Sequence, residues 1–312
     1  MKAVRVEDGS LGVANVAAPS GDGVRIKVRS AGICGSDLHM LDLGMVAPVT
    51  LGHEIAGELS DGTPVAVEPL GPCGHCAYCV AGDYNLCVMG SEMIYGVLRD
   101  GGMAEEMLVP ERSLVSLPRG VRAVDACLVE PLAVAVHGLR AIELRGDQRV
   151  AVIGGGAIGL CAVAAARPSG GDVALVARHD AQRAAGERLG AKLDTEGSYD
   201  VVVDAAGTRS SLEQAAELCR PGGTMVLLAS YWGGMEMPGM TICAKEIRIV
   251  PSAMYGRRGL ARDVDVAASL LGGFPDIPDA IISHRLPLDA AVEAFGVARD
   301  RKAGALKVVL EP

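Results

Sequence analysis

The stretch Arg149-Val-Ala-Val-Ile-Gly-Gly-Gly-Ala-Ile-Gly159 decides the fold of this chain. Its apolar residues predict a short buried strand, and glycines follow in the spacing G-x-G-x-x-G at the start of a predicted helix, residues 157–167. Such glycines let the backbone turn tightly and approach a pyrophosphate, while the helix amides favour the anion. The alternative is a glycine-rich turn without a ligand. We expect a dinucleotide site formed by Gly154, Gly156, Ala157, Ile158 and Gly159.

From about residue 125 onward, apolar strands alternate with alanine-rich helices. Further strands are predicted at residues 172–177, 200–204, 224–229 and 246–250, and a second helix at 181–189. Such alternation predicts an α/β fold with a doubly wound parallel sheet. Cofactor crevices form at the carboxyl ends of such strands, so Leu228 and Ser230 are expected to border a nicotinamide ring. The last of these strands is a candidate edge for pairing between subunits.

The residues after the second of these strands bear on the choice of cofactor. The dinucleotide pattern expects an acid about 20 residues beyond the glycines, to bind the ribose 2′-hydroxyl, and neutral Ala177 stands there. Arg178, with His179 beside it and Arg183 one turn into the next helix, could instead bind a 2′-phosphate. Asp180 fits better as the N-cap of that helix. We therefore expect NADP(H) in preference to NAD(H).

The first 118 residues have a different texture, rich in Gly and Pro with short alternating runs. Residues 24–29, 64–68 and 104–109 read as strands, so this part predicts a mostly β module with long loops. The end of the chain returns to a mixed pattern. Its last strand, residues 305–310, is expected to pair back with the N-terminal module.

Two groups of metal-ligating residue types lie in this module. Four thiols form two Cys-x-x-Cys steps with a fourth cysteine eight residues later, which suits a closed structural zinc site better than the alternative of a redox pair. These are Cys73, Cys76, Cys79 and Cys87. The second group is Cys34, His53 and Glu54, whose thiol, imidazole and carboxylate together also suit zinc, although Cys34 could be a buried thiol. Glu130 adds a carboxylate at the predicted junction with the second domain.

Composition narrows the class of protein. The chain has 312 residues, enough for two domains, and a formal charge of −9 that argues against nucleic acid or an anionic membrane as a partner. No apolar run reaches the length of a bilayer span, and the first residues read as a strand, so a cytoplasmic location is expected. The remaining cysteines, Cys127, Cys161, Cys219 and Cys243, are predicted to be small core residues.

Together these motifs resemble those of the zinc-dependent medium-chain dehydrogenases/reductases, the alcohol dehydrogenase family, in the branch with sorbitol and threonine dehydrogenases. The shared patterns are G-I-C-G-S-D-x-H, G-H-E, the cysteine lobe, V-E-P-L-A-V-A-V-H and G-G-G-A-I-G, in family order. The resemblance implies a Rossmann domain over residues 132–253 and a GroES-like catalytic domain over residues 1–131 and 254–312, with a zinc lobe at about 71–90. Residues 193–199 replace what is commonly a strand plus a helix, so the sheet is expected to lack one covering helix.

The resemblance also implies roles for individual residues. Cys34, His53 and Glu54 would hold a catalytic zinc, with Glu130 binding either the metal or its water, so that two zinc ions are expected per chain. Ser36 and His39 match a proton relay, and Asp37 matches a carboxylate that orients the histidine ligand. Lys307 is a candidate contact for Glu54. Ser252 and Met254 would border the nicotinamide, and a homodimer or homotetramer is implied.

The expected function is hydride transfer between NADP(H) and a secondary alcohol or polyol, or the matching ketone or aldehyde. One alternative is zinc-independent reduction of a quinone or enone on the same fold. Another is a non-catalytic protein that binds NADPH as a sensor or structural element.

Overall fold

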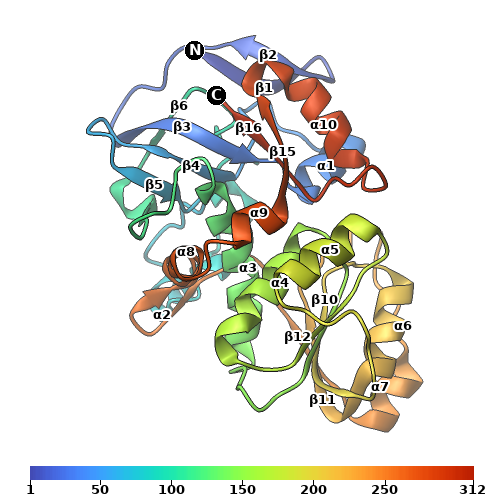
Figure 1. The fold of residues 1–312 in the computed structure, drawn as a ribbon. Helices are drawn as coiled ribbons and strands as arrows, with labels where there is room; N and C mark the ends of the chain where they lie inside the picture. Colours follow the sequence, from blue (N-terminus) through green and yellow to red (C-terminus); the bar gives the residue numbers. More distant parts are fainter.

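Two large β-sheets organise the chain in the computed structural model, which describes residues 1–312 (Figure 1). A five-stranded sheet is built from the middle of the chain and is flanked by helices. A seven-stranded sheet is built from both ends of the chain, so the two termini lie on the same side of the molecule (Figure 1). Two short hairpins, β1–β2 and β13–β14, complete the strands; their bounds are Lys2–Glu7 and Ser10–Asn15, and Arg257–Arg258 and Ala261–Arg262.

The five-stranded sheet is parallel throughout and has the order β12-β11-β10-β8-β9. Its strands are β8 (Val150–Ile153), β9 (Val173–Val176), β10 (Tyr199–Asp204), β11 (Cys219–Leu227) and β12 (Arg248–Pro251). The connecting helices are α4 (Ala157–Ala166), α5 (Asp180–Arg188), α6 (Arg209–Leu218) and α7 (Gly239–Lys245). The doubly wound fold predicted from the sequence is confirmed.

This sheet buries side chains on both faces, as parallel sheets do. Along β8, Val150 and Val152 join the core that includes residues of α4, whereas Ala151 and Ile153 join a second core that includes residues of α6. Between α5 and β10 the chain forms no helix, and only an isolated bridge between Ala174 and Lys192 continues the sheet. The expected loss of a covering helix is therefore confirmed.

The seven-stranded sheet is centred on β3, which pairs antiparallel with β4, β6 and β16. Its strands are β3 (Val24–Gly32), β4 (Glu54–Glu58), β5 (Pro64–Val67), β6 (Glu106–Val109), β7 (Leu114–Ser116), β15 (Ile282–Pro287) and β16 (Lys307–Glu311). The return of the C-terminal strand to the N-terminal module is confirmed, because β16 lies directly beside β3.

Helices connect and cover these sheets. The remaining α-helices are α1 (Gly35–Asp42), α2 (Ala77–Ala81), α3 (Val129–Ala141), α8 (Asp263–Gly273), α9 (Ile277–Ile281) and α10 (Ala291–Arg299). Short 3-10 turns are η1 (Tyr84–Leu86), η2 (Gly90–Met93), η3 (Glu111–Ser113), η4 (Ala126–Leu128), η5 (Arg167–Ser169) and η6 (Leu288–Ala290). No helix combines the length and the apolar character needed to span a bilayer.

Two local predictions are wrong. Cys243 is exposed on the short helix α7, which turns the neighbouring Ile242 toward the core instead. Asp180 is the first residue of α5 and not its cap, because His179 takes the N-cap position and its backbone N–H donates to Gln182 Oε1 at 3.3 Å. An acid in the first turn still favours the helix through its dipole. Cys127, Cys161 and Cys219 are buried as predicted.

A buried carboxylate joins α3 to α8. Asp263 is fully buried and lies 2.7 Å from His137 Nδ1 and 2.5 Å from Arg140 Nη1, both on α3, and it also accepts from the Gly256 N–H at 2.9 Å. Burial alone would raise the pKa of Asp263, but its bonds to His137 and Gly256 and the charge of Arg140 lower that pKa below its usual value. The ionised form is therefore stabilised in the folded chain.

We expect Asp263→Ala to lower the free energy of unfolding by about 3 kcal/mol at neutral pH, because Arg140 and the Gly256 amide lose a buried acceptor. Since folding depresses this pKa, the stabilisation is present above the unfolded-state value of about 3.9 and is lost as the pH falls through the lower folded-state value. Urea denaturation at several pH values measures this. Asp289→Ala, at an exposed carboxylate, is the control, and equal destabilisation by both variants would contradict the assignment.

Candidate functional site

Three metal-ligating side chains meet where β3 passes into α1. Cys34 is the N-cap of α1, two residues after the end of β3, and Glu54 is the first residue of β4, with His53 immediately before it. The strand register pairs Gly32 with Glu54, which brings the two sequence motifs together. One ligand atom from each of Cys34, His53 and Glu54 lies within 4.8 Å of the others. A thiol, an imidazole and a carboxylate so placed could hold a metal ion.

Glu54 is fully buried and shares its charge with Lys307 from β16. The Lys307 ammonium donates to Glu54 Oε1 at 2.6 Å and to the Ile33 carbonyl at 3.0 Å, which confirms the predicted contact. The other carboxylate oxygen, Oε2, has no hydrogen-bond partner and lies so close to Gly32 that a side chain there would collide with it. Burial alone would lower the pKa of Lys307, but the carboxylate of Glu54 and the charge of Cys34 raise it.

His53 is held between Ser36 and Asp37. Its Nε2 lies 3.4 Å from Ser36 Oγ, and its Nδ1 lies 3.4 Å from Asp37 Oδ1 in an alignment too poor for a hydrogen bond. The other oxygen of Asp37 accepts from the Cys34 N–H at 2.9 Å. Burial disfavours the imidazolium, but Asp37 and Cys34 outweigh it and raise the pKa of His53 well above its usual value. The site therefore favours a positive charge near this imidazole.

Glu130 is the second residue of α3 and is buried next to Tyr255, whose side chain is also fully buried. Burial raises the pKa of Glu130 to about 7, an effect that His53 partly offsets. Burial and the nearby Glu130 raise the pKa of Tyr255 well above its usual value, so the phenol stays protonated. Sequence reasoning missed Tyr255, because an isolated tyrosine between β12 and α8 carries no local signal.

His39 is exposed on α1 and stacks on Trp232, with ring centroids 5.6 Å apart and planes inclined by 25°. Trp232 follows β11, so this contact connects α1, whose N-cap is Cys34, to the five-stranded sheet. Its neighbour Tyr231 donates to Asp204 at 2.6 Å, and Asp204 also accepts from two backbone amides. The segment after β11 is thereby held against the sheet.

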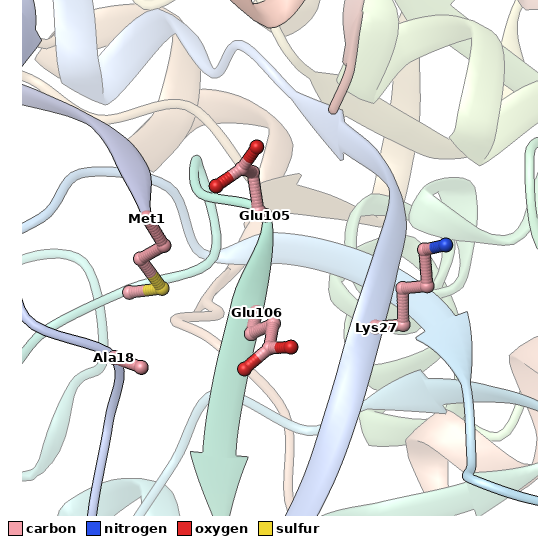
Figure 2. A pocket seen from close by; sticks show the side chains of 5 residues that line it. All are labelled: Met1, Ala18, Lys27, Glu105 and Glu106. Atoms are coloured by element: carbon pink, nitrogen blue, oxygen red, sulfur yellow. The ribbon is translucent and has the colours of Figure 1, made fainter. Parts of the chain in front are cut away.

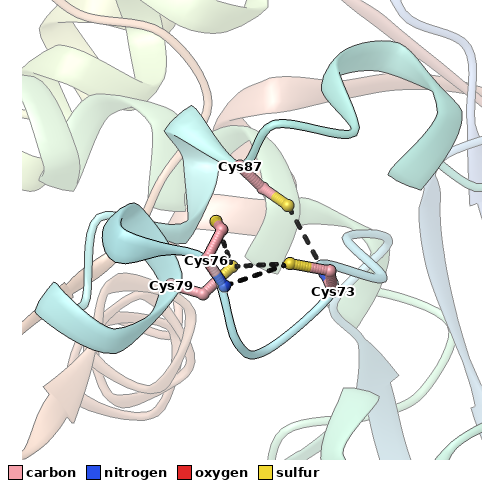
Figure 3. A group of neighbouring side chains, drawn as sticks. All are labelled: Cys73, Cys76, Cys79 and Cys87. Atoms are coloured by element: carbon pink, nitrogen blue, oxygen red, sulfur yellow. Dashed lines mark hydrogen bonds between the residues drawn. The ribbon is translucent and has the colours of Figure 1, made fainter.

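The four cysteines of the lobe come together around α2 and η1 (Figure 3). Cys76 Sγ lies 3.5 Å from Cys79 Sγ, and Cys73 Sγ lies 3.8 Å from Cys79 Sγ, without any disulfide. The backbone amides of Val88 and Cys79 lower the pKa of Cys76 to about 6. Four thiols so close together, one of them readily ionised, form a donor set suited to a tetrahedral cation.

The glycine loop lies between β8 and α4 as predicted. Gly154 has φ +106°, which favours glycine, and a side chain at Gly159 would collide with the Gly154 carbonyl. Gly156 is the N-cap of α4, has no capping side chain and faces open space. The first amides of α4 are therefore left for an anion. Ala157 and Ile158 form the first turn of that helix.

Arg178 and Arg183 flank the start of α5 and are both exposed. Neither forms an ion pair, and His179 between them is the N-cap of α5. The structure therefore leaves two free guanidinium groups beyond the carboxyl end of β9. At the ends of β11 and β12 stand Leu228 and Ser252, and the buried Ser252 Oγ has no hydrogen-bond partner.

Both of these residues pack against α3, because a Cβ at Gly138 would lie 2.6 Å from Leu228 Cδ2 and 3.3 Å from Ser252 Oγ. Ser230 is exposed just beyond Leu228, and Met254 has φ +57°, a strained value for a residue with a side chain. The predicted nicotinamide residues thus gather at one end of the sheet.

A separate surface hollow has a volume of about 320 Å³, and none of the predicted site residues lines it. Its walls, shown in Figure 2, are formed by Met1, Ala18, Lys27, Glu105 and Glu106.

Comparison with known proteins agrees with this geometry. Residues 20–119 match the family model of the alcohol dehydrogenase GroES-like domain, and residues 192–269 match that of the zinc-binding dehydrogenase. D-xylulose reductase A of Aspergillus niger is 30% identical over an alignment 318 positions long, gaps included, that covers 89% of this chain and 87% of that protein.

Two solved structures are similar over the whole chain. A protein of Sinorhizobium meliloti 1021 described as a zinc-binding dehydrogenase, solved with NADP, has a TM-score of 0.88 and 31% identity and covers 100% of this chain and 99% of its own. An Escherichia coli CFT073 protein described as an alcohol dehydrogenase, solved with NADH, has a TM-score of 0.86 and 27% identity with the same coverage.

We expect Lys307→Met to lower the free energy of unfolding of the metal-depleted protein by about 3–5 kcal/mol, because it leaves the Glu54 carboxylate buried without a counter-charge. The double variant Glu54→Gln/Lys307→Met should recover much of that loss. Urea denaturation after treatment with a chelator measures both. Lys2→Met removes an exposed ion pair with Asp289 and serves as the control; the interpretation fails if Lys307→Met is no more harmful than this control.

Proposed function

The chain belongs to the zinc-dependent medium-chain dehydrogenase/reductase family, the alcohol dehydrogenase family, and on that premise we propose that it transfers a hydride between NADP(H) and a secondary alcohol or polyol, or the matching ketone or aldehyde. The observation that carries the proposal is the group Cys34, His53 and Glu54, whose ligand atoms lie within 4.8 Å of one another. We assign residues 1–131 and 254–312 to the catalytic domain and residues 132–253 to the cofactor domain.

The donor set of this group fits zinc. Sulfur, nitrogen and oxygen donors are those that zinc accepts, and the buried Glu54 Oε2, which has no hydrogen-bond partner, is an acceptor that a cation would satisfy. We propose that Cys34, His53 and Glu54 hold the ion, with Glu130 as a fourth ligand or a hydrogen-bond partner of its water. Zinc bound there would act as a Lewis acid toward an alcohol or carbonyl oxygen. Asp37, beside His53 Nδ1, would orient the ring so that Nε2, next to Ser36, faces the metal.

The residues around this group offer a path for the proton. Ser36 Oγ lies beside His53, and the exposed His39 stands one turn further along α1, toward solvent. We propose that Ser36 receives the proton of the substrate hydroxyl and that His39 passes it to water. Trp232, stacked on His39, would cover one face of the imidazole ring and shield this end of the proton path.

The cysteine lobe is proposed to hold a second, structural zinc. Its four sulfur atoms match the four-thiolate set of closed sites, which leave no position open for substrate. A lobe with hardly any apolar core of its own needs such a metal to keep its shape, because metal binding contributes directly to folding. Two zinc ions per chain follow from the two groups.

The surroundings of the glycine loop support NADP(H) as the cofactor. The amides of α4 would bind the pyrophosphate, and the free guanidinium groups of Arg178 and Arg183 would bind a 2′-phosphate, with His179 between them. Leu228, Ser230, Ser252 and Met254 would border the nicotinamide. The relative of known structure solved with NADP agrees with this choice, whereas the one solved with NADH uses the other cofactor.

The relative named D-xylulose reductase A favours polyols and ketoses as the substrate class.

The exposed edge of β12 supports association of this chain into a dimer or tetramer, because an unpaired strand can pair with the same strand of a second copy of the chain.

We expect Cys34→Ser to reduce turnover of polyols by about a thousandfold, because the Lewis acid loses a ligand, while the fold and NADPH binding persist. Zinc content should fall from two ions to one per chain by atomic spectroscopy. Cys243→Ser, at an exposed thiol, should change neither quantity. Full activity of a zinc-free parent protein would point instead to zinc-independent quinone or enone reduction.

We expect Arg178→Ala to raise the Kd for NADPH about tenfold, or about 1.4 kcal/mol, and to leave the Kd for NADH nearly unchanged, because only NADPH carries the 2′-phosphate. Quenching of Trp232, the only tryptophan of the chain, reports binding of both nucleotides. Arg119→Ala is a matched surface control. Tighter binding of NADH than of NADPH by the parent protein would contradict the proposed cofactor.

A further inference from the structure

The cysteine lobe makes direct hydrogen bonds to a segment that continues from the five-stranded sheet. Residues 252–257, named here the cofactor-facing segment, run from the end of β12 to β13. Asn85 Nδ2 donates to the Ala253 carbonyl at 3.1 Å, and the Tyr84 hydroxyl lies 3.2 Å from the Gly256 carbonyl. The Arg257 N–H donates to the Gly82 carbonyl at 3.1 Å. Residues about 170 positions apart in sequence are thereby joined.

The lobe also packs tightly against this segment. A Cβ at Gly256 would lie 3.1 Å from Asn85 Oδ1 and 3.3 Å from the Gly82 carbonyl, so a side chain at this position would be crowded by the lobe. Asn85 is buried, and the Tyr84 hydroxyl also bonds to the buried Glu68. Arg262 in turn donates to Glu68 at 2.9 Å. Glu68 therefore holds Tyr84 beside the segment, and Asn85 contacts the segment from a buried position.

The contacts fall on either side of the strained residue of the segment. Met254 has φ +57°, and the carbonyls bound by the lobe belong to Ala253 and Gly256. Strained backbone persists where surrounding contacts determine it fully. Two residues of the same segment belong to the candidate site. Ser252, two residues before Met254, has an unpartnered hydroxyl, and Tyr255, the next residue after Met254, lies next to Glu130.

We propose that Tyr84 and Asn85 are positioning residues for the cofactor: they fix the cofactor-facing segment, and through it Ser252 and Met254, in the shape that receives the nicotinamide. This inference rests on the proposed function, which puts the nicotinamide against Ser252 and Met254. It assigns the lobe a part in nucleotide binding in addition to the stability that its metal would give. The adenosine half of the nucleotide would be held at α4 and α5, so its binding should not depend on Tyr84 and Asn85.

Equilibrium binding of two nucleotides tests the proposal. The probes are NADPH and 2′-phospho-ADP-ribose, which lacks the nicotinamide, with the zinc-replete full chain. Asn85→Ala and the isosteric Asn85→Asp both remove the donor to Ala253, and both are expected to raise the Kd for NADPH about fivefold, the effect of one lost hydrogen bond. The Kd for 2′-phospho-ADP-ribose should stay within about twofold of the parent value, because this probe makes no contact with the segment.

Two further variants sharpen the test. Asn15→Ala, at the only other asparagine of the chain and exposed at the end of β2, is the matched control and should alter neither Kd. Tyr84→Phe keeps the ring and removes only the hydroxyl, so it carries the test if the Asn85 variants do not fold. It is expected to raise the Kd for NADPH and to leave the Kd for 2′-phospho-ADP-ribose nearly unchanged, as Asn85→Ala does.

The outcomes separate this inference from the function on which it rests. A parent that binds both nucleotides, with variants that bind NADPH as tightly as the parent, overturns the positioning role alone. Equal weakening of both nucleotides also overturns it, because that result indicates general loosening of the fold. A parent that binds neither nucleotide overturns the proposed function, and this inference with it.

Discussion

A buried ion pair between the last strand and the start of β4 is the interaction on which the site depends. Glu54 has no exposure to water, so its charge requires the Lys307 ammonium at 2.6 Å. The lysine belongs to β16 and the glutamate to β4, and β3 runs between them. The C-terminal strand must therefore be in place before the Glu54 carboxylate gains its counter-charge, so the group Cys34, His53 and Glu54 depends on completion of the whole sheet.

The second constraint is the junction between the two sheets. Helix α3 connects them: it carries Glu130 in its first turn and packs against α4 and α8. Its residues His137 and Arg140 bind Asp263. The same carboxylate accepts from Gly256, within the segment that the cysteine lobe also contacts. The Asp263 carboxylate is thus paired with His137, Arg140 and the Gly256 amide, and a satisfied network of this kind favours one arrangement of the packed elements over others.

Local patterns predicted the fold and most of the candidate site. The glycine spacing and the clustered cysteines each lie within about twenty residues, where spacing alone is informative, and the alternation of strands and helices is a sum of such short segments. The contacts of Asn85 with Ala253 and of His39 with Trp232 join distant residues, and no local pattern indicates them. The prediction for Cys243 is wrong for a related reason: an apolar segment does not reveal which face of a short helix meets water.

Helix α3 also sets a register between the two halves of the site. Glu130 at its start and Gly138, which abuts Leu228 and Ser252, are separated by eight residues, or roughly 12 Å along a helix axis. One inserted residue would rotate the first end against the second by about 100°. A change in the length of α3 would therefore turn Glu130 away from the face that abuts Leu228 and Ser252, whereas a change in the length of a surface loop leaves this alignment intact.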